Sequence, residues 1–287
     1  HLRAGMLREH GGVGADELAV EHRMRAAAGV LGIGERRGGK LRELRCGELR
    51  GAGGGELGHE AVGDVLEHDA AATFAEALAA NGAQVTLLDV DGAQLEQEVT
   101  RMRSLGWQVH GEVADVRDHA ALDAAIDRAA ALTGRLDVIF ANAGVDSGPG
   151  FVGNWAGDTR PRNPLGALEN YTDERWNRVI DINLNGVFAT LRSAARHMRP
   201  NRSGKMIVTT SVAAYQCEPA IGSAYMAAKA ALTHLTRCVA QEMAADGINV
   251  NAIAPGFFIT NIGGGHAKHP AVQQAMSKVI PMGRVGF

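Results

Sequence analysis

Aromatic side chains, cysteines and long hydrophobic runs are all scarce in this sequence. Aromatics make up 5% of the 287 residues, and the three cysteines are Cys46, Cys217 and Cys238. The cysteines are far apart and have no metal-ligand spacing, so we expect free thiols in a reducing, cytoplasmic compartment and no metal site. No apolar run approaches the ~20 residues that span a bilayer, and no signal peptide is visible, so we expect no membrane association.

Charge is also modest and balanced between the two signs. The chain has 21% charged residues and a formal net charge of −3. Arginines and lysines form no cluster interleaved with aromatics, so the sequence gives no sign of nucleic-acid binding. The hydrophobic content of 46% is enough for one or two domains with a substantial core.

Residues 1–71 are dense in Gly, Arg, Glu and Ala and contain no convincing strand. Two fragments, 29–34 and 47–53, resemble a phosphate-binding glycine loop, but neither follows the apolar strand that such a loop needs. Two interpretations stay open. The segment is either a wrong reading frame of GC-rich DNA, which the lack of periodicity favours, or a real, disordered N-terminal extension.

From Ala72 onward, helical and strand patterns alternate. We expect helices at 73–80, 91–105, 120–132, 172–198 and 223–245, and strands at 85–89, 107–113, 136–140, 206–210 and 248–253. Strict alternation predicts βαβ units and a parallel sheet. Residues 146–170 break this rhythm and predict a long ordered loop. Its Trp155, Arg160 and Arg162 either contact a substrate or fold onto the loop itself.

The most informative stretch contains Ser211, Tyr225 and Lys229. Ser211 follows a β-branched strand, and Ser223 opens an Ala-rich helix on which Tyr225 and Lys229 are four residues apart. They therefore share one face of the helix. An ammonium one turn away favours the phenolate, so we expect a lowered tyrosine pKa. A serine hydroxyl at the strand end can hold a carbonyl oxygen, and the set suits proton transfer at an alcohol oxygen.

Further motifs occur in a fixed order around this stretch, and together they carry a resemblance. They are the acid-tipped strand at Asp89, Asp115-Val116, Asn142-Ala143-Gly144, Asn183 within N-L-N-G, Ser211, Tyr225-x-x-x-Lys229, and P-G-x-x-x-T from Pro255 to Thr260. With these motifs, residues from about 72 to 287 resemble the short-chain dehydrogenase/reductase family of the classical type.

The resemblance implies an α/β fold, a Rossmann-like doubly wound parallel sheet in a three-layer α/β/α arrangement. It implies that Tyr225 is the general acid/base, that Lys229 lowers its pKa and binds the nicotinamide ribose, and that Ser211 orients the substrate oxygen. Asn183 would hold the helix geometry and a relay water. The implied cofactor-binding residues are Asp89, Asp115, Val116, Asn142, Ala143, Gly144, Tyr225, Lys229, Pro255, Gly256 and Thr260.

The sequence departs from the family at both ends. The family's T-G-x-x-x-G-x-G loop should fall at about 64–71, where the chain reads D-V-L-E-H-D-A-A, with Glu67 and Asp69 in place of glycines. No first strand precedes it, and the family's last helix and strand do not follow Phe287. We therefore expect a domain at 72–287 that is incomplete at both ends, no strand beside residues 85–89, and poor cofactor binding by the chain as it stands.

The resemblance implies an NAD-dependent oxidoreductase that interconverts a secondary alcohol and a ketone. NAD is expected because Asp89 can accept hydrogen bonds from the adenine ribose, whereas the 2′-phosphate of NADP would meet its charge. The alternatives are a Rossmann-like binding protein without turnover and a non-functional fragment. The helices at 173–198 and 223–245 correspond to those that the family pairs, so the resemblance also implies a homo-oligomer, a dimer or a tetramer.

Overall fold

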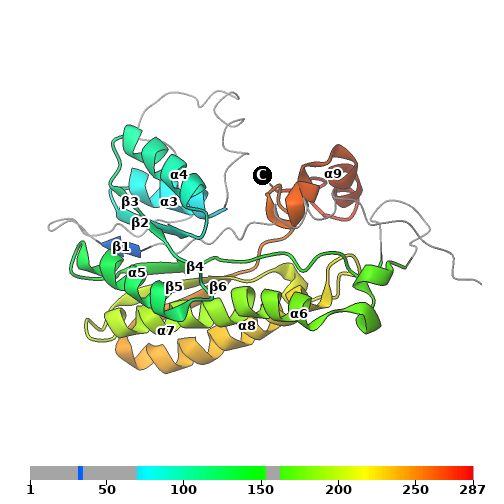
Figure 1. Cartoon of the computed structure of the whole chain (residues 1–287). Helices are drawn as coiled ribbons and strands as arrows, with labels where there is room; N and C mark the ends of the chain where they lie inside the picture. The colour runs from blue at the N-terminus through cyan, green and yellow to red at the C-terminus, as the bar shows by residue number, and fades with distance from the viewer. Residues whose placement is uncertain (1–31, 35–69, 153–161, 287) are drawn as a thin grey trace, which may run out of the picture.

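The computed structural model describes residues 32–34, 70–152 and 162–286. Six strands form one sheet in the order β3-β2-β1-β4-β5-β6 (Figure 1). Their bounds are β1 Gly32–Gly34, β2 Gln84–Asp89, β3 Val109–Val113, β4 Val138–Ala141, β5 Gly204–Thr209 and β6 Ile248–Ile253. The α-helices are α3 Ala70–Ala80, α4 Gly92–Ser104, α5 His119–Ala131, α6 Asp173–Ile180, α7 Val187–Met198, α8 Ser223–Met243 and α9 Pro270–Ser277.

Short helical turns connect these elements. A π-helix, η3 (Asp181–Gly186), joins α6 to α7, and the 3-10 turns are η1 Pro164–Gly166, η2 Leu168–Asn170, η4 Val212–Ala214, η5 Ala244–Asp246 and η6 Ile262–Lys268. In the part of the chain that the structure describes, no helix is both long and apolar enough to cross a membrane.

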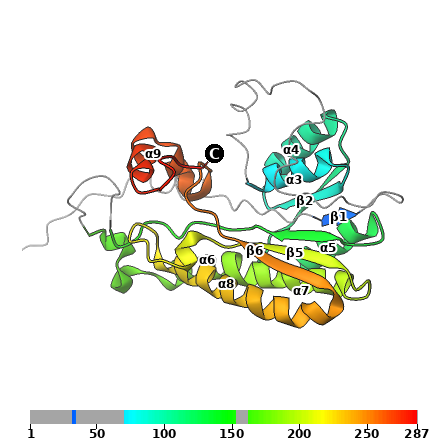
Figure 2. The ribbon, with the colours of Figure 1, turned by 180° about the vertical axis from the view of Figure 1, so that it is seen from behind.

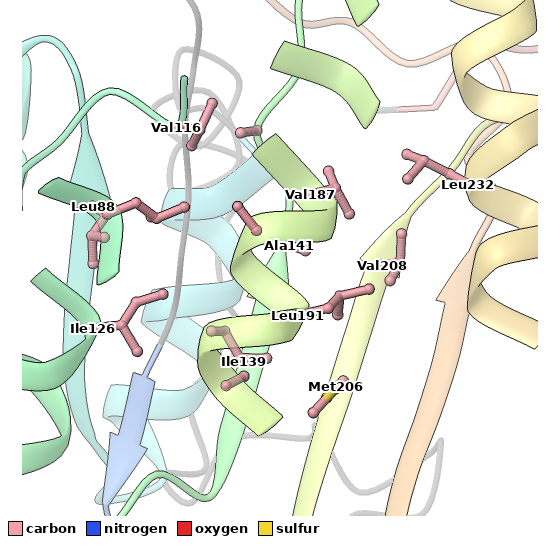
Figure 3. Packing of buried hydrophobic residues seen from close by; sticks show 14 of the residues in the cluster. Leu88, Val116, Ile126, Ile139, Ala141, Val187, Leu191, Met206, Val208 and Leu232 are labelled. Carbon is pink, nitrogen blue, oxygen red and sulfur yellow. The ribbon is translucent and has the colours of Figure 1, made fainter. Parts of the chain in front are cut away.

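Helices cover both faces of the sheet, which gives the three layers expected for a doubly wound fold. Helices α3 and α4 lie on one face and α5, α7 and α8 on the other (Figures 1 and 2). Each face has its own apolar core. The larger one contains Ile139 and Met206 from the sheet with Leu191 and Leu232 from the helices (Figure 3). The smaller one packs α3 and α4 on β2 and β3, with the rings of Phe74 and Phe140 stacked 4.9 Å apart.

The expectation that no strand lies beside β2 is wrong. The three residues of β1 fill the position between β2 and β4, and they run antiparallel to both, within a sheet whose other strand pairs are parallel. Residues 85–88 of β2 are all buried, so its backbone N–H and C=O groups cannot turn to water. The backbone of Gly32–Gly34 supplies the partners. The other residues of 29–34, and all of 47–53 and 64–69, lie outside the described residues.

The expected single helix at 172–198 is three segments. Thr172 does cap the first, because its hydroxyl accepts a hydrogen bond from the Arg175 amide. The π-helix η3 then inserts a wider turn between α6 and α7. Such turns often occur at functional sites. The expected loop at 146–170 contains η1 and η2, while Trp155 and Arg160 lie outside the described residues.

Candidate active site

The predicted site residues gather at one edge of the sheet. Asp89 ends β2, Asn142 follows β4, Ser211 follows β5 and Pro255 follows β6. Strands β2, β4, β5 and β6 all run in the same direction, so their carboxyl ends meet along this edge. In doubly wound sheets this is the edge where ligands bind.

Tyr225 and Lys229 lie in the first two turns of α8, next to the end of β5. The Ser211 side chain lies close enough to the Tyr225 hydroxyl to lower the pKa of the phenol as a hydrogen-bonding group. The Ser211 oxygen also accepts a hydrogen bond from the Ala213 amide at 3.2 Å, which caps η4 and fixes the serine. The Lys229 ammonium lies 5.6 Å from the centre of the Tyr225 ring and donates to the Thr209 carbonyl at 2.8 Å. The structure therefore brings the serine, tyrosine and lysine together.

Burial dominates the electrostatics of this group. Lys229 is only 3% exposed, and burial lowers its pKa to about 8. Burial also raises the pKa of the Tyr225 phenol; the hydrogen bond to Ser211 acts in the opposite direction, and the nearby Asp146 carboxylate raises the pKa further. The expected lowering of the tyrosine pKa is therefore wrong for the protein alone. The lysine is itself desolvated and directs its hydrogen bond to a backbone carbonyl rather than to the phenol.

Asn183 is fully buried in the π-helix η3, and its side chain forms hydrogen bonds with the backbone that follows β4. Its side-chain oxygen accepts from the Val145 amide at 2.7 Å, and its side-chain nitrogen donates to the Val145 carbonyl at 2.8 Å. A Cβ at Gly144 would lie 3.3 Å from the Asn183 side-chain oxygen and 3.6 Å from the Lys229 nitrogen. Gly144 thus marks the point where Asn183 and Lys229 converge.

The ends of β4 and β5 are linked through Asn142 and Thr209. The Thr209 hydroxyl donates to the Asn142 side-chain oxygen at 2.7 Å, while the Thr209 carbonyl receives the Lys229 bond. Ala143 is 3% exposed and packs in the core. One threonine therefore links the Asn-Ala-Gly segment to Lys229 of α8.

The P-G-x-x-x-T segment borders the same edge. The Pro255 carbonyl accepts from the Val212 amide at 3.0 Å, which holds the segment against η4. A Cβ added at Gly256 would meet nothing within 4 Å, so this glycine faces open space. The Thr260 hydroxyl accepts a long hydrogen bond of 3.4 Å from the Ile262 amide.

Two carboxylates lie toward the β2–β3 side of the edge. Asp89 is half-buried and accepts a hydrogen bond from the Asp91 amide at 2.8 Å. Asp115 pairs with Arg117 through both the backbone amide and the guanidinium, and this pairing lowers the Asp115 pKa. Val116 is 3% exposed and packs in the larger core (Figure 3). Asp89 and Asp115 therefore lie near the ends of β2 and β3, whereas Val116 belongs to the core.

Sequence reasoning missed two residues near this site, Tyr171 and Arg175. Both bind the Ser147 carbonyl, in the loop that follows β4. No motif spacing marks them, because a side chain that binds a distant backbone carbonyl leaves no periodic signal in the sequence.

The chain is similar to known oxidoreductases over most of its length. The family model for short chain dehydrogenase matches residues 71–270. A cis-4-hydroxycyclohexanecarboxylate dehydrogenase of Sinomonas cyclohexanicum is 37% identical over 216 residues, which cover 75% of this chain and 78% of the relative.

Solved structures agree with this match. The crystal structure of levodione reductase has a TM-score of 0.65 and 31% identity and covers 75% of this chain and 80% of that one. A gluconate 5-dehydrogenase from Burkholderia cenocepacia J2315, in complex with NADP and tartrate, has a TM-score of 0.64 and 30% identity, covering 76% and 79%. From its fold, its site and these matches, the chain belongs to the short-chain dehydrogenase family, oxidoreductases that act on CH–OH groups and use nicotinamide cofactors.

Proposed function

We propose that this chain interconverts a secondary alcohol and a ketone, with Tyr225 as the general acid/base. The observation that carries the proposal is the grouping of Tyr225 with Ser211 at the end of β5 and with the buried Lys229, whose nitrogen lies 5.6 Å from the centre of the Tyr225 ring. A substrate oxygen within reach of both hydroxyls would be oriented by Ser211 and would exchange its proton with Tyr225. Asn183 fixes the backbone beneath them.

The residues at this edge fit the nicotinamide and ribose end of a dinucleotide. Lys229 is a buried cation whose one hydrogen bond among the described residues goes to Thr209, so further N–H donors remain for ribose hydroxyls. Gly256 leaves backbone that a ligand can approach closely, because a Cβ there would meet nothing within 4 Å. When bound, the nicotinamide ring supplies or accepts the hydride. The pyrophosphate end would depend on residues 64–69, outside the described part of the chain.

The protein's own contribution is the movement of one proton. In ketone reduction, the neutral Tyr225 phenol donates to the developing alkoxide; its raised pKa keeps that proton in place at neutral pH. In alcohol oxidation the phenol must first ionise, and the ammonium of Lys229 stabilises the phenolate that forms. Ser211 holds the oxygen in both directions.

We propose NAD rather than NADP as the preferred cofactor. The support is the half-buried Asp89 carboxylate at the end of β2, which can accept from ribose hydroxyls but repels a 2′-phosphate. NADP is bound in the gluconate 5-dehydrogenase structure, so likeness to the family does not decide between NAD and NADP. The proposal therefore rests on Asp89.

The substrate is proposed to be a small alcohol or ketone, bordered by the loop after β4. The names of the similar hydroxycyclohexanecarboxylate dehydrogenase and levodione reductase make ring-bearing alcohols and ketones the first compounds to assay. Among the loop residues expected to contact substrate, Arg162 is exposed. We propose a cytoplasmic location because Cys217 and Cys238 are exposed, unpaired thiols, which suit a reducing compartment.

We also propose that copies of the chain associate through α7 and α8. Ala227, Ala230 and Ala231 are exposed on α8, and such small residues allow helices to approach closely. A hollow of about 490 Å³ lies between the outer faces of α7 and α8, bordered by Phe188 and Val239. Phe188 is 46% exposed, so a second copy of the chain could cover its ring.

The full chain, supplied with millimolar NAD, tests the function because high cofactor concentration compensates for weak binding. We expect NADH to appear with at least one secondary cyclic alcohol and to be consumed with the matching ketone. The second candidate, a binding protein without turnover, is favoured by Glu67 and Asp69 at the place of the glycine loop. It predicts that NAD raises the unfolding temperature while no alcohol is oxidised.

A further inference from the structure

Arg175 of α6 joins two backbone segments that border the site. Its guanidinium donates to the Leu165 carbonyl at 2.5 Å and to the Ser147 carbonyl at 3.0 Å. The guanidinium carbon also lies 4.3 Å above the centre of the Tyr171 ring, and the Tyr171 hydroxyl donates to the same Ser147 carbonyl at 3.2 Å. The chain around Ser147 is thus held by two donors that stack on each other.

The same helical stretch holds this chain at a second point. Asn183 lies two helical turns beyond Arg175 and binds both backbone groups of Val145. The stretch from α6 into η3 therefore forms hydrogen bonds with Val145 and Ser147, two alternate residues of one segment. The segment that begins at Val145 comes straight from the Asn-Ala-Gly motif at the end of β4.

The opposite side of this segment contacts the chain that leads into the catalytic helix. The Gly150 amide donates to the Ala220 carbonyl at 3.0 Å, and the Val152 amide donates to the Pro219 carbonyl at 3.1 Å. A Cβ at Gly150 would lie 2.2 Å from the Pro219 carbonyl oxygen, so the two backbones touch.

The contact continues up to the start of α8. A Cβ at Gly222 would lie 2.3 Å from the Ser147 hydroxyl oxygen, which is buried and has no hydrogen-bond partner among the described atoms. The Tyr225 amide donates to the Gly222 carbonyl at 3.2 Å. A shift of Ser147 would therefore press on the turn that carries Tyr225.

We propose that Arg175 is a positioning residue for the substrate. It fixes the segment 145–152 against residues 218–222, and this segment forms the wall of the site beside Tyr225. The inference rests on the proposed function, because it takes the space beside Tyr225 as the substrate site. An arginine suits this position better than a lysine does, because its planar fork reaches two carbonyls of separate segments while its face stacks on Tyr171, whereas a lysine is a point donor.

The first arm of the test requires no activity. Trypsin should cut slowly after Arg162, because the Asn163 amide that follows is bonded to the Phe151 carbonyl at 2.9 Å. In Arg175→Met we expect cleavage at the Arg162–Asn163 bond to become about tenfold faster, the factor that one hydrogen bond to a charged group commonly contributes. Cleavage after Lys205, in β5, should stay at the wild-type rate because it reports global unfolding.

The second arm measures kinetics with the alcohol that the wild-type chain oxidises. We expect Arg175→Met to raise KM for the alcohol about tenfold, with kcat and the dissociation constant of NAD changed less than about threefold. Arg175→Lys should fall between wild type and Arg175→Met. Arg237→Met, an exposed arginine on α8, is the matched control and should match wild type in both arms.

The two arms separate the failure of this inference from that of the proposed function. Unchanged cleavage at Arg162–Asn163, or a kcat/KM within about twofold of wild type despite faster cleavage, would overturn the positioning role. A wild-type chain that oxidises no alcohol overturns the proposed function and, with it, the substrate role. If Arg175→Met does not fold, the same comparison is made with Arg175→Lys.

Discussion

The two halves of the sheet differ in how completely they are built. The half from β4 to β6 consists of parallel strands in continuous register. At its edge, hydrogen bonds hold the side chains of Ser211, Lys229 and Asn183. The half from β1 to β3 contains two parallel strands and the three-residue antiparallel β1, which separates them from β4. The half from β4 to β6 carries the residues proposed for catalysis and is called the catalytic half; Asp89, proposed to bind the cofactor, lies in the other half.

The direction of β1 explains why the difference matters. Gly34 pairs with Gln84 at the start of β2, whereas Asp89 lies at its end. The carboxyl end of β1 therefore points to the edge opposite the site. A loop that followed β1 directly would therefore begin at the edge opposite to Asp89. β1 meets the half from β4 to β6 where Ile33 pairs with Val138.

The largest expected effect is a loss of activity that involves the catalytic half alone. Tyr225→Phe removes the proton donor and should lower kcat by ~10²–10⁴-fold, with cofactor affinity nearly unchanged. Tyr215→Phe is the control, because Tyr215 lies on the neighbouring turn with 63% of its surface exposed and should retain wild-type rates. Steady-state kinetics with a responsive alcohol decides it. More than about a tenth of the activity left in Tyr225→Phe would show that another group moves the proton.

The sequence predicts several elements of the half from β4 to β6 for a physical reason. Tyr225 and Lys229 meet because four residues make one helical turn, and β6 has its predicted bounds, 248–253, because its residues alternate between buried and exposed. The π-helix around Asn183 could not be predicted, since its residues fit an ordinary helical period. The strand Gly32–Gly34 could not be predicted either, because it pairs through its backbone and such pairing leaves no pattern of side chains in the sequence.

The next effect tests whether β1 belongs to the sheet. Ile33 pairs with Val85 on one side and Val138 on the other, so Ile33→Pro removes a backbone donor from the middle of the sheet. We expect the free energy of unfolding to fall by about 3 kcal/mol, the upper range for one buried backbone group left unpaired. Urea unfolding followed by circular dichroism measures it, with Ile33→Val as the control that keeps the N–H. If the two variants were equally stable, β1 would not be paired in the sheet.

A comparable effect concerns the buried lysine of the catalytic half. The Lys229 pKa is about 8 in the folded chain, and an unfolded lysine has a pKa of ~10.4. Between these values the unfolded chain holds more protons, so the free energy of unfolding should rise with pH, by about 3 kcal/mol in total. Below pH 8 the buried charge keeps its full cost.

The measurement compares wild type with Lys229→Met from pH 7 to pH 10.5, the range set by the two pKa values. The stability difference between them should move in favour of wild type as pH rises. Lys278→Met, at an exposed lysine of the C-terminal region, is the control. A difference that stays constant over this range would show that Lys229 is not desolvated as its burial indicates.

The smallest expected effect is a change in cofactor preference, and it concerns Asp89 in the half from β1 to β3. Asp89 lies at the end of β2, and Val90, which follows it, is 41% exposed. Asp89→Ala with Val90→Arg replaces a negative charge by a positive one where the adenine ribose is expected. The 2′-phosphate of NADP carries about −1.5 to −2 charges, so the ratio of kcat/KM for NAD over NADP should fall by about tenfold to a hundredfold.

The two single variants and Asp89→Asn separate charge from structure in that experiment. Asp89→Asn keeps an acceptor for the Asp91 amide, which Asp89 binds at 2.8 Å, but loses the negative charge. It should therefore shift the ratio toward NADP without a loss of stability, and Val90→Arg alone should shift it by less than the double variant. Because the charges are partly exposed, the shift should shrink as salt is added. Equal or better use of NADP by the unmodified chain would refute the NAD preference and would show that Asp89 does not face the ribose, while leaving the catalytic half and its Tyr225 intact.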